Sequence, residues 1–199
     1  MKQKNNEVKS MSYLKQGVSL EQAGEKLLSA FNVSHSGVDR TPERFANAML
    51  ELLSGYMDDP KKYLKVFDNV SSSSMIVKDH VPFISFCEHH LLPFTGVAHM
   101  GYLPNMKSKK VIGLSKLVRI FRCFSNQFQV QERIGEQFVD FIQNELKCDG
   151  CICVIKATHM CVSSRGVKSQ GSVMTTSAIR GSFTLPEVRA EFMSLVNLK

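Results

Sequence analysis

The feature that most constrains the fold is the group Cys87-Glu88-His89-His90, which lies between two segments rich in β-forming residues. Cys and His are ligands that Zn²⁺ prefers, and the C-x-x-H spacing of Cys87 and His90 suits one ion. Two ligands do not make a site, and the best third ligand is Cys161, far downstream. A fold that uses this group must therefore bring residue 161 beside residue 87. Three protein ligands leave a position open for water, as in catalytic zinc sites.

Taken singly, residues of these types are more often structural. A free Cys is frequently a buried hydrophobic residue, and a lone His is frequently a satisfied core or surface group. The combination of Cys87, His90 and Cys161, with His89 and His159 beside the proposed ligands, favours a metal site over that alternative.

A further cysteine pair, Cys148-Asp149-Gly150-Cys151, has the C-x-x-C spacing of metal ribbons and redox pairs. It spans a predicted turn into a strand, and no second pair of ligands stands at ribbon spacing. We interpret the pair as incidental and predict one zinc ion per chain.

Composition is that of an ordinary globular protein. The chain has 199 residues, of which 43% are hydrophobic and 22% charged, enough for one domain with an appendage. No apolar run is long enough to span a membrane, and the polar N-terminus lacks the apolar segment of a signal peptide. The six cysteines are irregularly spaced, which fits a reducing compartment better than a disulfide framework. We therefore predict a cytoplasmic protein with no membrane partner.

The formal net charge of +7 indicates an anionic partner. The basic residues are not gathered into one arm or one helix stripe, and the densest cluster, 107–110, is typical of a solvated loop. A nucleic-acid partner is therefore weakly supported, and a polyanionic nucleotide substrate explains the same excess of positive charge. We predict a nucleotide substrate and no nucleic-acid partner.

Residues 1–70 are predicted to form a helical N-terminal region. Ser19 and Gln22 have the spacing of a capping box ahead of an apolar helical stripe. Thr41-Pro42 predicts a second helix, with Thr as the N-cap and Pro in the first helical position. The pattern changes after a polar linker, so residues 71–199 are predicted to form a second, catalytic domain.

From residue 75 the periodicity predicts strand, strand, helix, helix, strand, strand. The segments are 75–77 with 81–86, 94–103, a helix with Ser115 as its N-cap, 131–147, 151–157 and 173–183, before a short C-terminal helix. This order favours an α+β fold in which an antiparallel sheet carries two helices on one face. Little of the chain remains to cover the other face, so we predict a homo-oligomer.

These motifs resemble the GTP cyclohydrolase I family. The matching stretches are 41–44, 87–90, 101–104, 111–116, 129–133, 159–161 and 165–167. They run in family order over nearly all of the chain from Gly37 onward. The resemblance implies the tunnelling fold, in which subunits join their sheets into a barrel. It also implies a toroidal homodecamer with active sites at subunit interfaces.

The resemblance implies that the chain opens the imidazole ring of GTP, releases C8 as formate and forms 7,8-dihydroneopterin triphosphate. Cys87, His90 and Cys161 would bind Zn²⁺, and a water activated by the metal would attack C8. His89 and His159 would be the acid/base groups, because imidazole titrates near neutrality. Which of the two histidines would protonate N7 of guanine stays open.

The remaining family positions would bind the substrate. Glu132 would accept hydrogen bonds from the guanine edge, with help from Gln131 beside it. A list of triphosphate and ribose contacts follows from the same motifs: Ser115, Lys116, Arg119, Arg165 and, from a neighbouring subunit, Arg44. Arg suits this work through its planar fork of donors.

The chain departs from the family pattern at Asn47, where Lys is common, and at 125–128, where an Arg is replaced. These differences affect the expected strength of triphosphate binding and leave the metal ligands intact. One alternative is a tunnelling-fold relative acting on another pterin or deazapurine. Another is a basic, zinc-stabilised module that binds nucleic acid, which predicts a closed site of four ligands.

Overall fold

The computed structural model describes residues 19–68, 74–108 and 110–196. Contacts divide the chain into two compact units, one ending at Asp58 and the other beginning at Asp59. The boundary predicted at residue 70 falls within 69–73, outside the described residues. The stretch just before it includes the strand β1 (Val66–Asp68), so the predicted helical region is not helical to its end.

The first unit is a pair of helices with short 3-10 turns. Its elements are α2 (Leu20–Ala30), η1 (Ser36–Val38), α3 (Thr41–Leu52) and η2 (Ser54–Met57). The predicted capping box is confirmed, because Ser19 and Gln22 exchange hydrogen bonds between side chain and backbone at 2.9 and 3.1 Å. The prediction of Thr41 as an N-cap is wrong, since α3 begins at Thr41 and its N-cap, Arg40, provides no side-chain hydrogen bond.

The second unit is built on a five-stranded sheet in the order β5-β2-β3-β6-β7. The long strands are β2 (Ile76–Cys87), β3 (Pro93–Leu103), β6 (Gly150–His159) and β7 (Met174–Gly181), and each pairs with its neighbour antiparallel. The short β5 (Phe128–Gln129) runs parallel to the end of β2. A separate antiparallel pair joins β1 to β4 (Lys110–Ile112). The predicted α+β class and antiparallel sheet are therefore confirmed.

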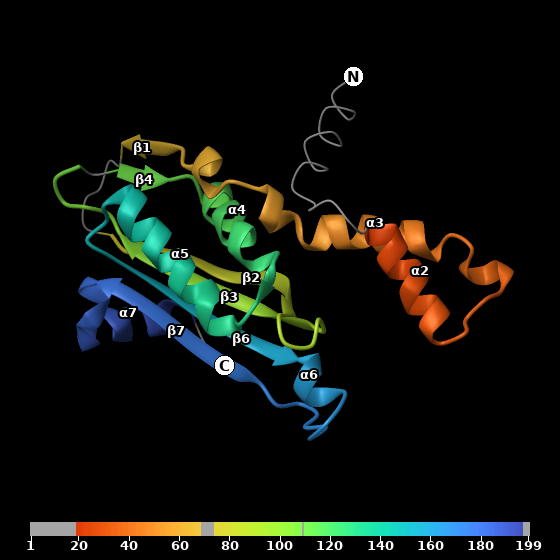
Figure 1. Cartoon of the computed structure of the whole chain (residues 1–199). Helices are drawn as coiled ribbons and strands as arrows, with labels where there is room; N and C mark the ends of the chain where they lie inside the picture. The colour runs from red at the N-terminus through yellow and green to blue at the C-terminus, as the bar shows by residue number, and fades with distance from the viewer. Residues whose placement is uncertain (1–18, 69–73, 109, 197–199) are drawn as a thin grey trace. The chain divides into compact units, whose positions relative to one another are not determined.

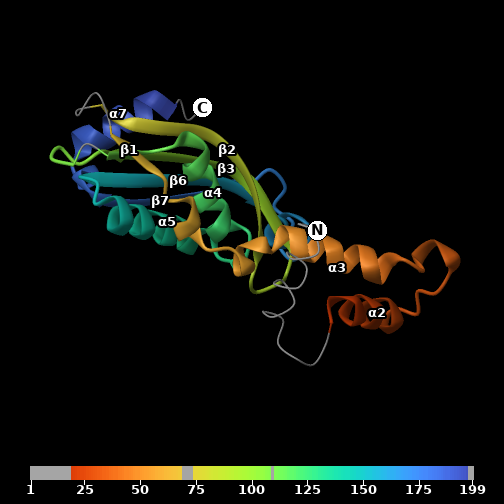
Figure 2. The same cartoon turned by 90° about the horizontal axis from the view of Figure 1, so that it is seen from above.

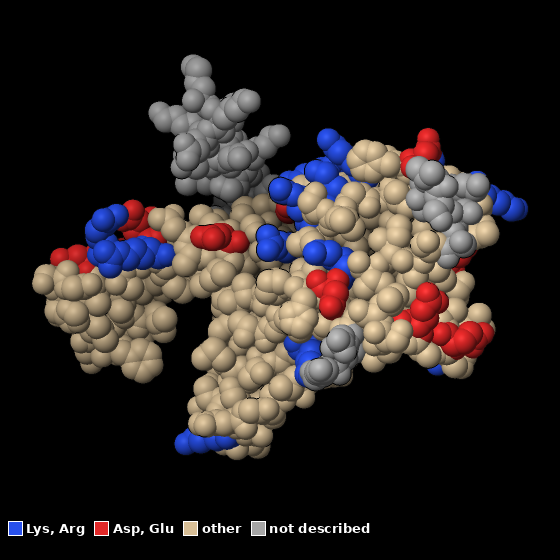
Figure 3. All heavy atoms as spheres, turned by 180° about the vertical axis from the view of Figure 1, so that it is seen from behind, with Lys and Arg blue, Asp and Glu red and all other residues tan. Residues whose placement is uncertain are grey.

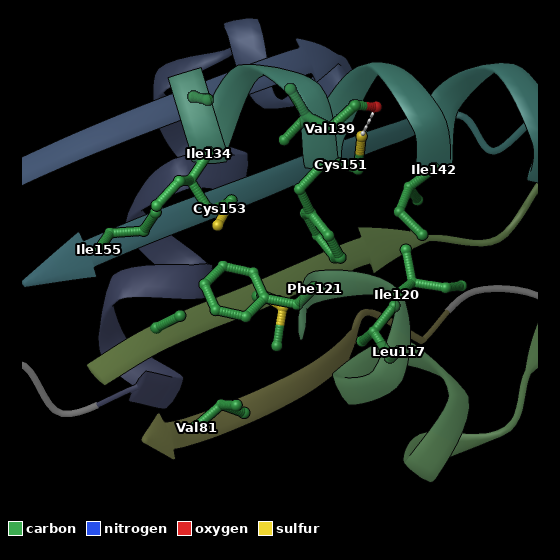
Figure 4. Packing of buried hydrophobic residues seen from close by; sticks show 14 of the residues in the cluster. Val81, Leu117, Ile120, Phe121, Ile134, Val139, Ile142, Cys151, Cys153 and Ile155 are labelled. Atoms are coloured by element: carbon green, nitrogen blue, oxygen red, sulfur yellow. Dashed lines mark hydrogen bonds between the residues drawn. The ribbon is translucent and has the colours of Figure 1, made fainter. Parts of the chain in front are cut away.

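Two helices cover one face of this sheet, as Figure 1 shows. They are α4 (Leu114–Ser125) and α5 (Gln131–Leu146). Alternate strand residues such as Ala98, Cys153 and Ile155 point toward them and are fully buried or nearly so. The apolar faces of both helices meet these residues in one cluster, part of which Figure 4 shows. Burial of this cluster fixes how the sheet and the two helices pack.

The opposite face is partly covered by the chain itself, which corrects the expectation that little was left for it. The C-terminal helix α7 (Pro186–Val196) follows the 3-10 turn η4 (Ser182–Thr184) and packs Phe192 and Val196 against Ile152 and Val154. Figure 2 shows α7 and α5 on opposite sides of the sheet. Gly101 permits this approach, because a Cβ there would lie 2.8 Å from the Phe192 ring.

Helix starts were predicted less well than helix faces. Ser115 is not the N-cap of α4, because the helix begins at Leu114 after Gly113. The predicted helix at 131–147 is confirmed to within one residue, with Lys147 closing it in the left-handed conformation. The sequence did not predict the short elements η3 (Pro60–Tyr63) and α6 (Met160–Ser163). Among the described residues, no helix combines the length and apolar character needed to cross a membrane.

Candidate active site

The turn after β2 fixes the central thiol. Cys87 ends the strand and is 7% exposed. Its N–H donates to the carbonyl of Leu92 at 2.9 Å, and the N–H of Leu91 donates to the Cys87 carbonyl at 2.8 Å. Leu91 adopts the left-handed conformation (φ 53°) that this tight turn requires. His89 and His90 are exposed on the turn, and the Nδ1 atom of each ring lies 3.8 Å from the Cys87 sulfur.

The fold brings Cys161 to this turn. Cys161 lies on α6, directly after β6, and β6 reaches the turn because its last residue, His159, pairs with Phe94 of β3. The ligand atoms of Cys87, His90 and Cys161 all lie within 4.8 Å of one another. A tetrahedral zinc ion with ordinary Zn–S and Zn–N bonds needs ligand atoms about 3.5–3.8 Å apart. The three donors therefore fit a zinc ion after small side-chain movements.

The electrostatics of the cluster favour a cation. Partial burial, followed by the hydrogen bond and charge of Cys87, raises the pKa of the Cys161 thiol. The positive charge of Arg165 acts in the opposite direction, which places this predicted substrate contact close to the cluster. A cation bound between the two sulfurs would favour the thiolate form of Cys161.

His159 is held in one orientation beside the cluster. Its ring stacks on Phe94 with centroids 4.4 Å apart and an interplanar angle of 5°. Its Nε2 lies 2.8 Å from Oε1 of Gln131, an oxygen that only accepts hydrogen bonds. The neutral ring therefore carries its proton on Nε2 and leaves Nδ1 as the acceptor. Burial lowers the pKa of His159, and the charge of Glu132 acts in the opposite direction, so Glu132 also belongs to this neighbourhood.

Gln131 has a role that the sequence did not reveal. It is 1% exposed. Its Nε2 lies 3.0–3.1 Å from three acceptors, which are the carbonyls of Ile155 and Met174 and the hydroxyl of Thr176. With its oxygen bound to His159, the whole amide is engaged. The predicted contact of Gln131 with guanine would have to use the second lone pair of its oxygen, because its nitrogen already has three acceptors within 3.1 Å.

A second unpredicted contact ties the turn to α5. Arg133 forms a two-pronged ion pair with Glu88, with distances of 2.6 and 2.9 Å. The hydrogen bond from Arg133 lowers the pKa of Glu88 below its ordinary value. Both residues stood in motifs already singled out, and their opposite charges were the available signal. The pair fixes the turn that carries Cys87 and His90 relative to Glu132, the residue before Arg133.

The predicted triphosphate contacts on α4 lie away from the cluster of Cys87, His90 and Cys161. Ser115 and Arg119 line a cavity of about 440 Å³ with Lys78, Leu114, Val118 and Arg122. The Arg119 guanidinium lies over the Tyr63 ring, 5.7 Å from its centroid. Lys116 lies beside Ser115 in the first turn of α4. The sequence missed Lys78 and Arg122, because only the packing of β2 against α4 places them together.

The cavity and the cluster lie toward opposite ends of β2. Lys78 is nine positions before Cys87, which corresponds to about 25–30 Å along a strand that contains a bulge. This span is longer than an extended nucleoside triphosphate. The remaining predicted contact, Arg44, is exposed on α3 in the first unit.

Charge elsewhere on the surface is mixed. On the face seen in Figure 3, the described Lys and Arg side chains lie in several groups with Asp and Glu between them, and no continuous basic stripe crosses it. The basic cavity beside α4 is thus a local concentration of positive charge that suits a compact polyanion.

Comparison with known proteins gives matches over nearly all of the chain. The family model described as GTP cyclohydrolase I matches residues 20–197. The chain is 43% identical over 184 residues to a GTP cyclohydrolase 1 of Dehalococcoides mccartyi, covering 91% of this chain and 97% of that protein. It is 44% identical to GTP cyclohydrolase 1 of Bacteroides thetaiotaomicron, covering 83% of each. It is 45% identical to the Porphyromonas gingivalis protein of the same name, covering 80% of this chain and 82% of that one.

Proposed function

Because the chain belongs to the GTP cyclohydrolase I family, and so is an enzyme of that activity, we propose that it opens the guanine imidazole ring of GTP. The products are formate and 7,8-dihydroneopterin triphosphate. The observation that carries this assignment is the convergence of Cys87, His90 and Cys161 beside His159. Neither a pterin or deazapurine relative nor a nucleic-acid-binding module gains support from the relatives described above.

Cys87, His90 and Cys161 hold the catalytic zinc ion in this proposal. Their donor set, two thiolates and one imidazole, is of the kind that Zn²⁺ binds, and their spacing fits it. When bound, the ion supplies a Lewis acid and lowers the pKa of a water at its open position. Glu88 and Arg133 keep the turn that carries two of these ligands in place.

His89 and His159 are the acid/base groups. His159 acts through Nδ1, because Gln131 occupies its Nε2. Gln131 is therefore a positioning residue for His159, in addition to its predicted contact with guanine. Glu132 is exposed in the first turn of α5, where its carboxylate can accept hydrogen bonds from N1–H and the 2-amino group of guanine. Adenine lacks this pair of donors, so the site selects GTP over ATP.

The triphosphate binds in the cavity beside α4, where Ser115, Arg119, Lys78 and Arg122 meet. Since one chain places this cavity far from its own metal cluster, a complete site combines the cluster of one subunit with the cavity of another. This arrangement supports a tunnelling fold that assembles into a toroidal homodecamer. Lys116, Arg165 and, from a further subunit, Arg44 complete the polyanion contacts. We place the enzyme in the cytoplasm, where its six free cysteines stay reduced.

The direct test is formate release and pterin fluorescence from purified protein supplied with GTP. Fluorescent product is expected with metal-replete protein and is lost with a chelator and in the Cys161→Ala variant. The matched control is Cys123→Ala, a buried thiol on α4 that lies outside the cluster and bonds the Arg119 carbonyl. If metal-replete protein released no formate from GTP, or if Cys161→Ala matched the unaltered protein, the proposal would fail.

A further inference from the structure

A second group of metal-ligand side chains lies on β2, at a bulge well before Cys87. Lys78 pairs with Met100 and Val81 pairs with Ala98, so two residues of β2, Asp79 and His80, oppose the single residue His99 of β3. A bulge of this kind re-aims the side chains of the strand that contains it. Here it directs a carboxylate and an imidazole toward a third ligand-type residue.

The distances between these groups suit a shared ion. The ligand atoms of Asp79, His80 and His99 all lie within 4.8 Å of one another. Nδ1 of His99 is hydrogen-bonded to Oδ1 of Asp79, and Nδ1 of His80 lies 4.0 Å from the same oxygen. The two imidazole rings meet edge to face with centroids 5.5 Å apart.

Two observations distinguish this cluster from an ordinary ion pair. His99 is 1% exposed, and its Nε2 is buried without a hydrogen-bond partner among the described residues. A purely structural histidine in a sheet normally has both nitrogens satisfied. His80 adopts the left-handed conformation (φ 54°), which is uncommon for a residue other than Gly. A Gly would serve the bulge equally well, whereas His80 adds an imidazole beside Asp79 and His99.

We propose that Asp79, His80 and His99 bind a divalent transition-metal ion, separate from the zinc of the active site. Two imidazoles with one carboxylate are a donor set that suits Zn²⁺ and Fe²⁺. His80 is exposed and Asp79 is partly exposed, which gives the ion a path from solvent, and His99 anchors the site in the sheet. The site lies on the face of the sheet that carries α7, because His99 pairs with Val154 of the α7 cluster.

This proposal changes the expected metal content from one ion per chain to two. The sequence did not indicate the second site, because Asp79 and His80 stand far from His99 along the chain and in no recognisable spacing. The proposal does not depend on the assigned activity. Its failure would leave the Cys87 cluster and GTP turnover unaffected.

The test is titration of the full-length, metal-free protein with Co²⁺, followed by absorption. Thiolate bound to Co²⁺ gives a charge-transfer band that a site of imidazole and carboxylate lacks. The unaltered protein is expected to bind two equivalents, only one of which raises this band. His80→Ala and Asp79→Asn are each expected to lose the second equivalent and keep the band. Cys161→Ala is expected to lose the band and keep the other equivalent.

His35→Ala is the matched control for His80→Ala, because His35 is an exposed imidazole in the first unit. It is expected to bind both equivalents. Uptake of a single equivalent by the unaltered protein would overturn the proposal. So would a His80→Ala variant that still binds two, because the second ion would then lie elsewhere. Circular dichroism of each variant establishes that its fold is retained.

Discussion

The two ends of β2 differ in what they contribute and in how they are held. At its C-terminal end, Cys87 belongs to a tight turn whose hydrogen bonds and Glu88–Arg133 ion pair lie within one chain. Near its N-terminal end, Lys78 lines a basic cavity whose other cations are carried by α4. In the proposed function, the C-terminal end carries the ligands of the catalytic ion and the acid/base groups, and the N-terminal end carries the positive charge that binds the triphosphate.

Under the proposed function, a single chain holds two half-sites. Each is well formed on its own, but β2 keeps them too far apart for one nucleotide to reach both. Assembly of subunits would bring a cavity to each cluster, which ties catalysis to oligomerisation.

The largest expected effect is recovery of activity by mixed subunits. Cys161→Ala damages the metal end, and the double variant Lys78→Ala/Arg119→Ala damages the cavity. Each alone is expected to have little activity at low GTP. When both are expressed together, random assembly leaves about a quarter of the sites with two intact halves. Formate release from the co-purified mixture measures this. No recovery in a mixed oligomer would mean that each site uses one chain.

Glu132→Gln should sharpen the assignment of the metal end. The neutral amide presents an N–H₂ group where guanine also donates, so one hydrogen bond is lost and one repulsion is gained. We expect kcat/KM for GTP to fall about 10³-fold or more. Glu136→Gln, one turn further along α5 and paired with Arg180, is the control and should stay within a few-fold of the unaltered enzyme. Equal losses in both variants would contradict the role of Glu132.

Lys78→Met tests the cavity end. Removal of one cation that contacts the triphosphate should raise KM about 10- to 100-fold, because hydrogen bonds to charged groups are worth more than neutral ones. The value of kcat should change little, since Lys78 lies far from Cys87, His90 and Cys161. Lys156→Met, a half-buried Lys on β6, is the comparison variant. A fall in kcat at unchanged KM would place Lys78 outside the substrate site.

The sequence predicted the parts of this fold that depend on long periodic segments. The apolar spacing in 131–147 and the apolar run in 151–157 were sufficient, because burial of one face decides the helix and burial of both faces decides the strand. Short elements such as β5 and α6 were not predicted, since only their partners in space stabilise two to four residues. Ser115 failed as a cap because Gly113 precedes the helix without a side-chain hydrogen bond.

For the candidate site, residue type predicted a metal site at Cys87, His90 and Cys161, and the fold brings these three side chains together. Cys87, His90 and Cys161 were recognisable because few other uses explain them together. The contacts of Gln131 with His159 and of Lys78 with α4 depend on which strand faces which helix, and local patterns do not contain that information. The pairing register of β2 and β3 brings His99 opposite Asp79 and His80, and the sequence does not show this register.

A smaller effect is expected at the contact between the turn and α5. Arg133→Met leaves Glu88 without its partner, so the turn that carries His89 and His90 gains freedom. We expect kcat to fall about 10-fold, as is typical when a supporting residue of a metal site is lost. Zinc content at saturating metal should be retained, and elemental analysis checks this. Arg180→Met, which breaks an exposed ion pair on β7 with Glu136 and Asp140, is the control.

The smallest effect on activity is expected from Cys151, which resembles Cys87 in type but not in surroundings. Its thiol is fully buried and donates to the Val139 carbonyl at 3.3 Å, as Figure 4 shows. The hydrogen bond with Cys148, followed by burial, raises its pKa far above the ordinary value, so it stays a thiol. Cys151→Ala should therefore keep its zinc content and turnover while the free energy of unfolding falls by about 1–2 kcal/mol. Denaturant unfolding measures the loss. A drop in zinc content would mean that Cys148 and Cys151 bind metal after all.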